Sequence, residues 1–78
     1  MGDLDRITFD PRVMGGQACI RGMRLPVSLV VNLVASGMSE AAILDEYPDL
    51  EVEDIRQALR YAALLTTEQI LPSESASR

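Results

Sequence analysis

The chain has 78 residues, of which 47% are hydrophobic, and a formal net charge of −5. A domain of this size has a small core and often needs a disulfide, a bound metal or self-association for stability. Because Cys19 is the only cysteine and the chain has no histidine, an internal disulfide is excluded and a metal site is not expected. We therefore expect a homodimer or a higher oligomer, with no cofactor.

The charge is distributed unevenly along the chain. Residues 40–54 contain seven carboxylates and no basic residue, whereas all seven basic residues, every one an arginine, lie in 1–26 and 55–78. The excess negative charge therefore belongs to one acidic block, and two arginine-bearing segments flank it.

The N-terminal segment lacks the basic and apolar regions of a signal peptide, and no stretch approaches the roughly 20 apolar residues of a membrane-spanning helix. We expect a cytoplasmic protein that does not contact a membrane.

The first expected element is a short β hairpin or arm at about 7–26. Ile7 to Phe9 form a β-type run, Gly15-Gly16 indicates a turn, and a second extended piece is expected from Ala18 to Leu25. Pro26 cannot donate a ladder hydrogen bond, so the extended chain should end there and a helix should begin.

The first helix is expected at 27–36, with Pro26 at its entry and Gly37 at its exit. Its β-branched content alone would also fit a strand. The segment is apolar on nearly every side, which indicates that it is covered from more than one direction. We expect a dimer mate to supply part of that cover, and the candidate interface residues are Val27, Val30, Val31 and Val34.

Ser39 is a good N-cap for a second helix at 40–47, which Pro48 ends. A third helix is expected at 52–66, with a buried stripe of Val52, Ile55, Leu59 and Ala62. The fold class is therefore mainly α: a three-helix, helix-turn-helix domain, either homeodomain-like or winged-helix-like, with an N-terminal arm. We assign it to residues 1–71 and expect a flexible tail at 72–78.

The order and spacing of several short motifs resemble domain-of-unknown-function family 433 over about 7–63. The residues that carry the resemblance are Gly16, Cys19 to Val27, Gly37 to Ser39, Ile43-Leu44, Tyr47 to Leu50, Asp54-Ile55, Ala58-Leu59 and Tyr61-Ala62. The resemblance implies a trihelical fold and a role as the antitoxin of a pair whose toxin resembles a PIN-type ribonuclease. Ala18, Met23 and Glu51 depart from the family pattern, where proline, threonine and a hydroxyl cap are usual.

Candidate DNA-binding residues are arginines and one glutamine. Arg21 and Arg24 in the arm either contact phosphates or pair with the acidic block. Arg56, Gln57 and Arg60 are expected on an exposed face of the third helix, where they either read bases or make contacts within the helix, such as Glu53 with Arg56.

The candidate surface for a protein partner is the acidic block. Its outward residues either form a solvated face or dock on the basic RNA groove of a nuclease by charge mimicry. These residues are Glu40, Asp45, Glu46, Asp49 and Glu53.

No catalytic constellation is identifiable, so we expect no enzyme and no small-molecule substrate. Cys19 is interpreted as a small apolar residue, and a reactive thiol is the alternative. Three hypotheses remain: an antitoxin that binds a nuclease toxin and also represses its own operon through DNA, a stand-alone DNA-binding regulator, and an adaptor that only self-associates.

Overall fold

The computed structural model describes residues 4–66, which form three helices and a two-stranded antiparallel sheet. The sheet pairs β1 (Ile7–Thr8) with β2 (Cys19–Ile20), and a short turn, η2 (Met14–Gly16), lies between them. The helices are α1 (Val27–Ala35), α2 (Glu40–Glu46) and α3 (Val52–Leu65). The three expected helices end one residue earlier than predicted, and the mainly α architecture with an N-terminal hairpin is confirmed. The expected tail at 72–78 lies outside the described residues.

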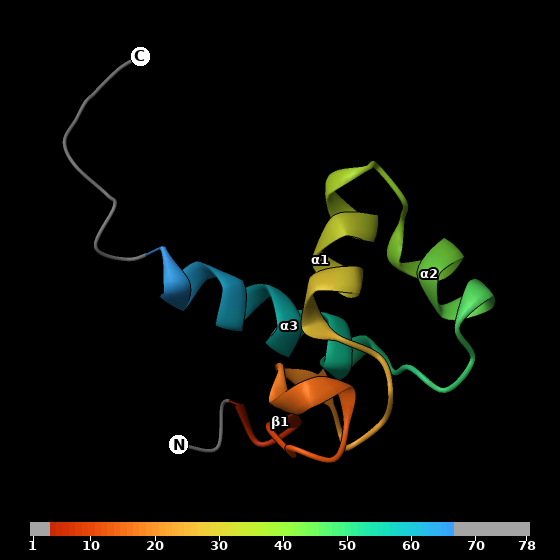
Figure 1. Ribbon diagram of the computed structural model, residues 1–78. Helices are drawn as coiled ribbons and strands as arrows, with labels where there is room; N and C mark the ends of the chain where they lie inside the picture. Colours follow the sequence, from red (N-terminus) through yellow and green to blue (C-terminus); the bar gives the residue numbers. More distant parts are fainter. Residues whose placement is uncertain (1–3, 67–78) are drawn as a thin grey trace, which may run out of the picture.

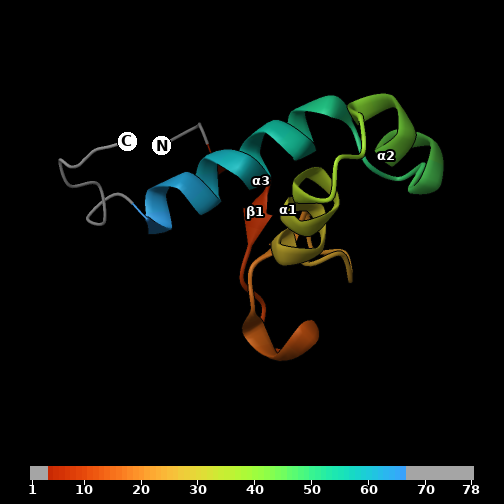
Figure 2. The same cartoon turned by 90° about the horizontal axis from the view of Figure 1, so that it is seen from above.

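The helices are arranged around α3, which runs along the length of the domain (Figure 1). α1 crosses it near its middle, the N-terminal arm packs beside the same region, and α2 lies at one end (Figures 1 and 2). The core between these elements is formed by buried aliphatic side chains: Ile7, Ile20, Val27, Val30, Ile43, Leu50, Ile55 and Ala58. In the described part of the chain, none of the helices has the length and apolar character that crossing a lipid bilayer requires.

Both helix boundaries between α1 and α2 have the structure that the sequence indicates. Gly37 has φ +99°, its N–H donates to Val34 O at 3.0 Å, and the next N–H donates to Leu33 O at 3.2 Å. This is a Schellman C-cap, in which glycine removes the cost of a left-handed residue. Ser39 then caps α2, because its Oγ accepts a hydrogen bond from the Ala42 N–H at 3.1 Å.

The expectation of one extended piece from Ala18 to Leu25 is wrong. After Ile20 the chain makes a tight turn in which Arg21 (φ +46°) and Gly22 (φ +72°) both have positive φ. The Met23 N–H donates to Ile20 O at 2.8 Å and closes the turn. Two consecutive positive φ values are the signature of a type I′ turn, which reverses the chain. The chain then runs back beside β2, as the bridge between Cys19 and Pro26 shows.

The buried face of α3 also differs from the expected stripe. Ile55 is fully buried, but Val52 and Leu59 are 40% and 36% exposed. Asp54 and Gln57 are buried instead, together with Ala58. The helix is thus rotated toward a face that carries two polar side chains, because the N-terminal arm supplies polar partners for them.

Candidate functional site

Asp54 is the centre of a polar cluster that joins the N-terminal arm to the start of α3. Its side chain has no exposed surface, and its two oxygens accept four hydrogen bonds. Oδ1 accepts from Arg6 Nη1 at 3.0 Å and from Arg21 Nε at 3.0 Å. Oδ2 accepts from Arg21 Nη2 at 2.8 Å and from the Glu51 N–H at 2.8 Å. Four contacts fill the acceptor capacity of a carboxylate, so the buried charge is fully compensated.

The protonation of Asp54 reflects these contacts. Burial by itself would raise the pKa of this carboxyl group, because it disfavours the charged form. The hydrogen bonds from Arg21, from the Glu51 N–H and from Arg6 outweigh burial and hold the pKa below its ordinary value. In turn, the hydrogen bond to Asp54 raises the pKa of Arg21. The cluster is therefore ionic at neutral pH.

Gln57 extends the same cluster toward the start of the chain. Its Oε1 accepts the Arg6 N–H at 2.9 Å, and its Nε2 donates to Asp5 Oδ1 at 3.0 Å and to Glu53 Oε2 at 3.4 Å. Gln57 is only 4% exposed, so the expectation that it lies on the exposed face of a recognition helix is wrong. Its amide satisfies groups of this chain and does not face solvent.

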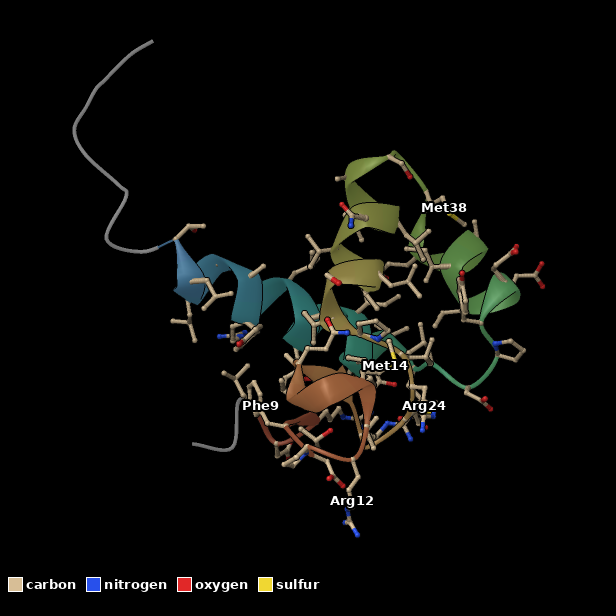
Figure 3. All side chains as sticks on the ribbon, viewed as in Figure 1. Phe9, Arg12, Met14, Arg24 and Met38 are labelled. Carbon is tan, nitrogen blue, oxygen red and sulfur yellow. The ribbon has the colours of Figure 1, made fainter. Side chains whose placement is uncertain are left out.

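The candidate DNA-binding arginines separate into two groups. Arg21 makes a bidentate pair with Asp54, and its Nη2 also donates to Asp49 O at 2.7 Å, so pairing with the acidic block is confirmed. Arg24, Arg56 and Arg60 are exposed, and Arg24 lies on the outside of the arm (Figure 3). Arg56 Nε lies 3.8 Å from Glu53 Oε1, which confirms the expected contact within α3.

The acidic surface keeps most of its carboxylates exposed. Glu40, Asp45 and Glu46 lie on α2, and Asp49 lies in the connection to α3. Within residues 4–66, none of these four side chains forms an ion pair or a hydrogen bond to another side chain. Glu53 is the exception in the expected set, since it contacts Arg56 and Gln57.

The candidate dimer residues of α1 are only partly available. Val27 and Val30 are 4% and 0% exposed and belong to the core of the chain itself, so in the single chain they leave little surface for a dimer mate. Val31 and Val34 are partly buried and pack against that core.

Cys19 is buried, as expected for a small apolar residue of the arm. No group of three or more potential metal ligands occurs in the part of the chain that the structure describes.

Sequence reasoning missed the role of Arg6 and Asp5. Arg6 contacts Glu51 and Asp54 and also donates its backbone N–H to Gln57, while Asp5 accepts from Gln57. These contacts join residues 45 to 52 positions apart. The only signal in the sequence is that two charged residues directly precede a β-type run.

The arrangement defines a small, mainly helical domain that an N-terminal hairpin locks against its last helix. The chain belongs to the family described as a protein of unknown function (DUF433), which matches residues 7–62. The family resemblance inferred from the sequence motifs is confirmed.

Two related proteins extend this assignment. The fold is similar to the crystal structure of a DUF433 member protein from Anabaena variabilis, with a TM-score of 0.71, 38% identity, and coverage of 85% of this chain and 64% of that chain. The uncharacterized protein y4eO of Sinorhizobium fredii is 41% identical over 56 residues, which are 72% of this chain. The chain spans about a quarter of the length of that curated relative.

Proposed function

We propose that this chain is a binding module of the antitoxin type, which uses its exposed carboxylates to dock on the basic RNA groove of a PIN-like ribonuclease. The proposed contact surface consists of Glu40, Asp45, Glu46 and Asp49, with Glu53 at its edge. Repression of its own operon through DNA is a secondary activity in this proposal.

The observation that carries the proposal is the placement of Asp45 and Glu46 in the last turn of α2. Carboxylates at the C-terminal end of a helix face the negative end of its dipole, which is locally unfavourable. No basic residue occurs between 40 and 54 to compensate them. Side chains that lower stability without a compensating contact are typical of functional surfaces, and a basic partner would provide the missing compensation.

The first experiment is a pull-down of the tagged chain from its own host at moderate salt, with bound protein identified by mass spectrometry and bound DNA recovered in parallel. A stoichiometric ribonuclease-like protein supports the antitoxin function. Recovery of DNA alone favours the stand-alone regulator, and recovery of neither favours an adaptor that only self-associates.

A variant then tests the surface itself. Replacing Asp45 and Glu46 together by Asn and Gln should slow association with the captured protein about tenfold and weaken its salt dependence, because exposed charges act mainly on the association rate. The stability of the chain should stay the same or rise slightly, since the helix end loses an unfavourable charge. Asp10→Asn, which removes a carboxylate outside the acidic block, is the matched control and should leave association unchanged.

DNA binding by the arginines has less support than protein binding. Gln57 is buried, and Arg21 is held by Asp54 although its side chain is 36% exposed, whereas Arg24, Arg56 and Arg60 have exposed side chains. Arg56 also lies beside Glu53, and a carboxylate near a phosphate opposes binding. If the regulator function holds, the double variant Arg56→Ala and Arg60→Ala should abolish a strongly salt-dependent affinity for DNA.

A further inference from the structure

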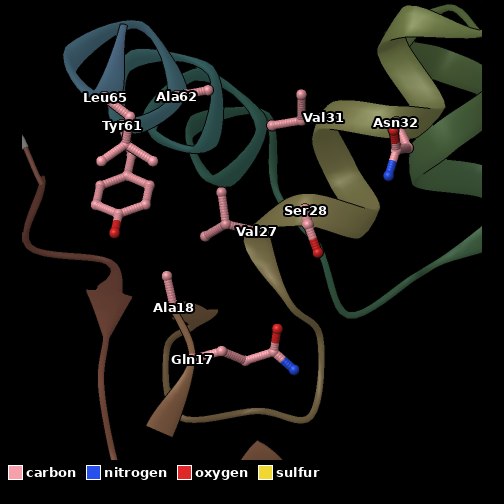
Figure 4. Close-up of a pocket in the computed structure, with 9 residues that line it drawn as sticks. All are labelled: Gln17, Ala18, Val27, Ser28, Val31, Asn32, Tyr61, Ala62 and Leu65. Atoms are coloured by element: carbon pink, nitrogen blue, oxygen red, sulfur yellow. The ribbon is translucent and has the colours of Figure 1, made fainter.

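A groove lies between α1, the C-terminal half of α3 and the segment before β2 (Figure 4). It has a volume of about 270 Å³. Val27 and Val31 form its α1 side, and Tyr61, Ala62 and Leu65 form its α3 side. No lining residue is charged, and the polar groups are side chains such as Gln17 and Asn32 at its edge.

The α3 wall of this groove is the continuation of the buried face of the helix. Ile55 and Ala58 are fully buried, and Ala62 and Leu65 follow at helical spacing on the same face. Leu65 is nevertheless 59% exposed. Figures 1 and 2 show why, since the C-terminal half of α3 extends beyond α1 in both views. The apolar stripe of α3 therefore extends beyond the part of the helix that the other described elements cover.

Other exposed apolar side chains lie next to the groove. Leu64 is 54% exposed and follows Tyr61 by three residues, which places both on adjacent parts of the helix surface. Phe9 is 57% exposed and packs its ring against Tyr61, with ring centroids 5.9 Å apart. A groove with exposed leucines at its rim is the type of surface that binds another protein.

We propose that a second copy of this chain covers the groove in a two-fold dimer, with Leu64 and Leu65 of each copy packed against the groove of the other. A two-fold interface requires one patch that is complementary to itself, and the overhanging end of α3 beside the groove offers a protrusion and a recess on one patch. The proposal moves the interface expected from the sequence toward α3, because Val27 and Val30 lie in the core and only Val27 and Val31 of the four expected valines line the groove.

The charge distribution favours a second copy as the occupant. Residues 27–39 carry no charge, so the α1 side of the groove presents no repulsion to an identical surface. The acidic surface on α2 lies at the other end of the molecule, whose long dimension is 39 Å (Figures 1 and 2). Two chains of net charge −5 can therefore meet at this face while their acidic ends point apart. A basic partner would be attracted to the opposite end.

The test is sedimentation equilibrium of the full chain, without any partner, between about 1 and 100 μM. We expect a monomer–dimer equilibrium. Val31→Glu and Leu65→Glu should each raise the dimer dissociation constant about a hundredfold or more, because a two-fold dimer contains the substitution twice and would bury both new carboxylates. Leu65 is exposed in the single chain, so this variant should fold, which circular dichroism checks.

Val52→Glu is the matched control, since Val52 is an exposed valine of α3 at the far end from the groove. It should leave the dissociation constant unchanged. A wild-type chain that is monomeric throughout the concentration range would overturn the proposal. The groove would then have another occupant, such as residues 67–78 or a different protein. A dimer that survives both glutamate variants would also overturn it, because the interface would then lie elsewhere. Since the assay uses the purified chain alone, its result does not depend on the proposed ribonuclease partner.

Discussion

The two halves of α3 depart from the usual rule of burial in opposite directions. In the N-terminal half, Asp54 and Gln57 are polar and buried, with 0% and 4% of their surface exposed. In the C-terminal half, Leu64 and Leu65 are apolar and more than half exposed. One continuous helix of 14 residues thus carries both an internal polar contact and an external apolar one.

The difference between the halves lies in where their partners are. Every oxygen contact of Asp54 is made within the chain, by Arg6, Arg21 and the Glu51 N–H. A buried polar group with all its hydrogen bonds costs little, whereas exposed leucines gain nothing until another surface covers them. The first half of α3 therefore stabilises the single chain, and the second half is available for association. Substitutions of single residues in α3 test whether its two halves differ in this way.

The largest effect is expected at Ile55, which is fully buried at the centre of the core. Ile55→Ala should lower the free energy of unfolding by about 3 kcal/mol, because it removes buried apolar surface and leaves a cavity. Urea denaturation followed by circular dichroism measures this loss. A loss below about 1 kcal/mol would mean that the face of α3 is packed differently from the described core.

Asp54→Asn should cost about 2 kcal/mol, because the new amide group points N–H donors at sites now occupied by N–H donors of Arg21, Arg6 or Glu51. The partners Arg6 and Arg21 still reach solvent, which keeps the loss below that of a wholly buried pair. The same urea titration measures it. Asp49→Asn, at an exposed carboxylate, is the control and should change stability by less than about 0.5 kcal/mol.

Acid should remove the contribution of Asp54 without a mutation. Because the pKa of Asp54 is lower in the folded chain than in the unfolded one, its contribution is fully present above about pH 4. It is lost as the pH falls through the folded-state pKa, where the carboxyl group protonates. The difference in stability between the wild type and Asp54→Asn should therefore shrink below about pH 4. A difference that stays constant down to pH 2 would contradict the ionic interpretation of the cluster.

Gln57→Glu isolates the second buried polar side chain and should cost about 1 to 2 kcal/mol. The substitution replaces the donor Nε2 by an oxygen that would face the carboxylates of Asp5 and Glu53. If Gln57 were instead a surface residue for reading DNA, this change would leave thermal unfolding nearly unaltered. Differential scanning fluorimetry distinguishes the two outcomes, with Arg56→Gln as a control at an exposed side chain of the same helix.

These residues show which features of the fold and of the polar cluster can be predicted from the sequence. Local signals were sufficient for the helices, for the Gly37 and Ser39 caps and for the contact between Glu53 and Arg56, because each depends on neighbours within a few positions. The buried face of α3 was not predictable from periodicity, which favoured Val52 and Leu59 over Asp54 and Gln57. Which face of α3 is buried depends on Arg6 and Asp5, which lie about 50 residues away in the sequence. A charged residue such as Asp54 can be predicted to be buried only when its partner is known.

The turn at Arg21 was missed for a related reason. Arginine rarely adopts positive φ, so the sequence around it reads as extended chain. Its bidentate pair with Asp54 and its N–H bond to Arg6 O at 2.7 Å hold it in that conformation. Gly22 alone indicates only that a strand would be less stable at this position. The contact of Arg21 with α3 is what favours a turn there, and the sequence does not show that contact.

The smallest effect is expected at Leu65, and its size should depend on protein concentration. In the single chain Leu65→Ser should change the free energy of unfolding by less than about 0.5 kcal/mol, because the side chain is 59% exposed. Where the proposed dimer is populated, association stabilises the folded state by mass action, and the serine variant should lose that added stability. Thermal unfolding of both proteins over a hundredfold range of concentration measures this dependence. If the variant were equally destabilised at every concentration, Leu65 would be packed within its own chain, and the C-terminal half of α3 would no longer differ from the N-terminal half.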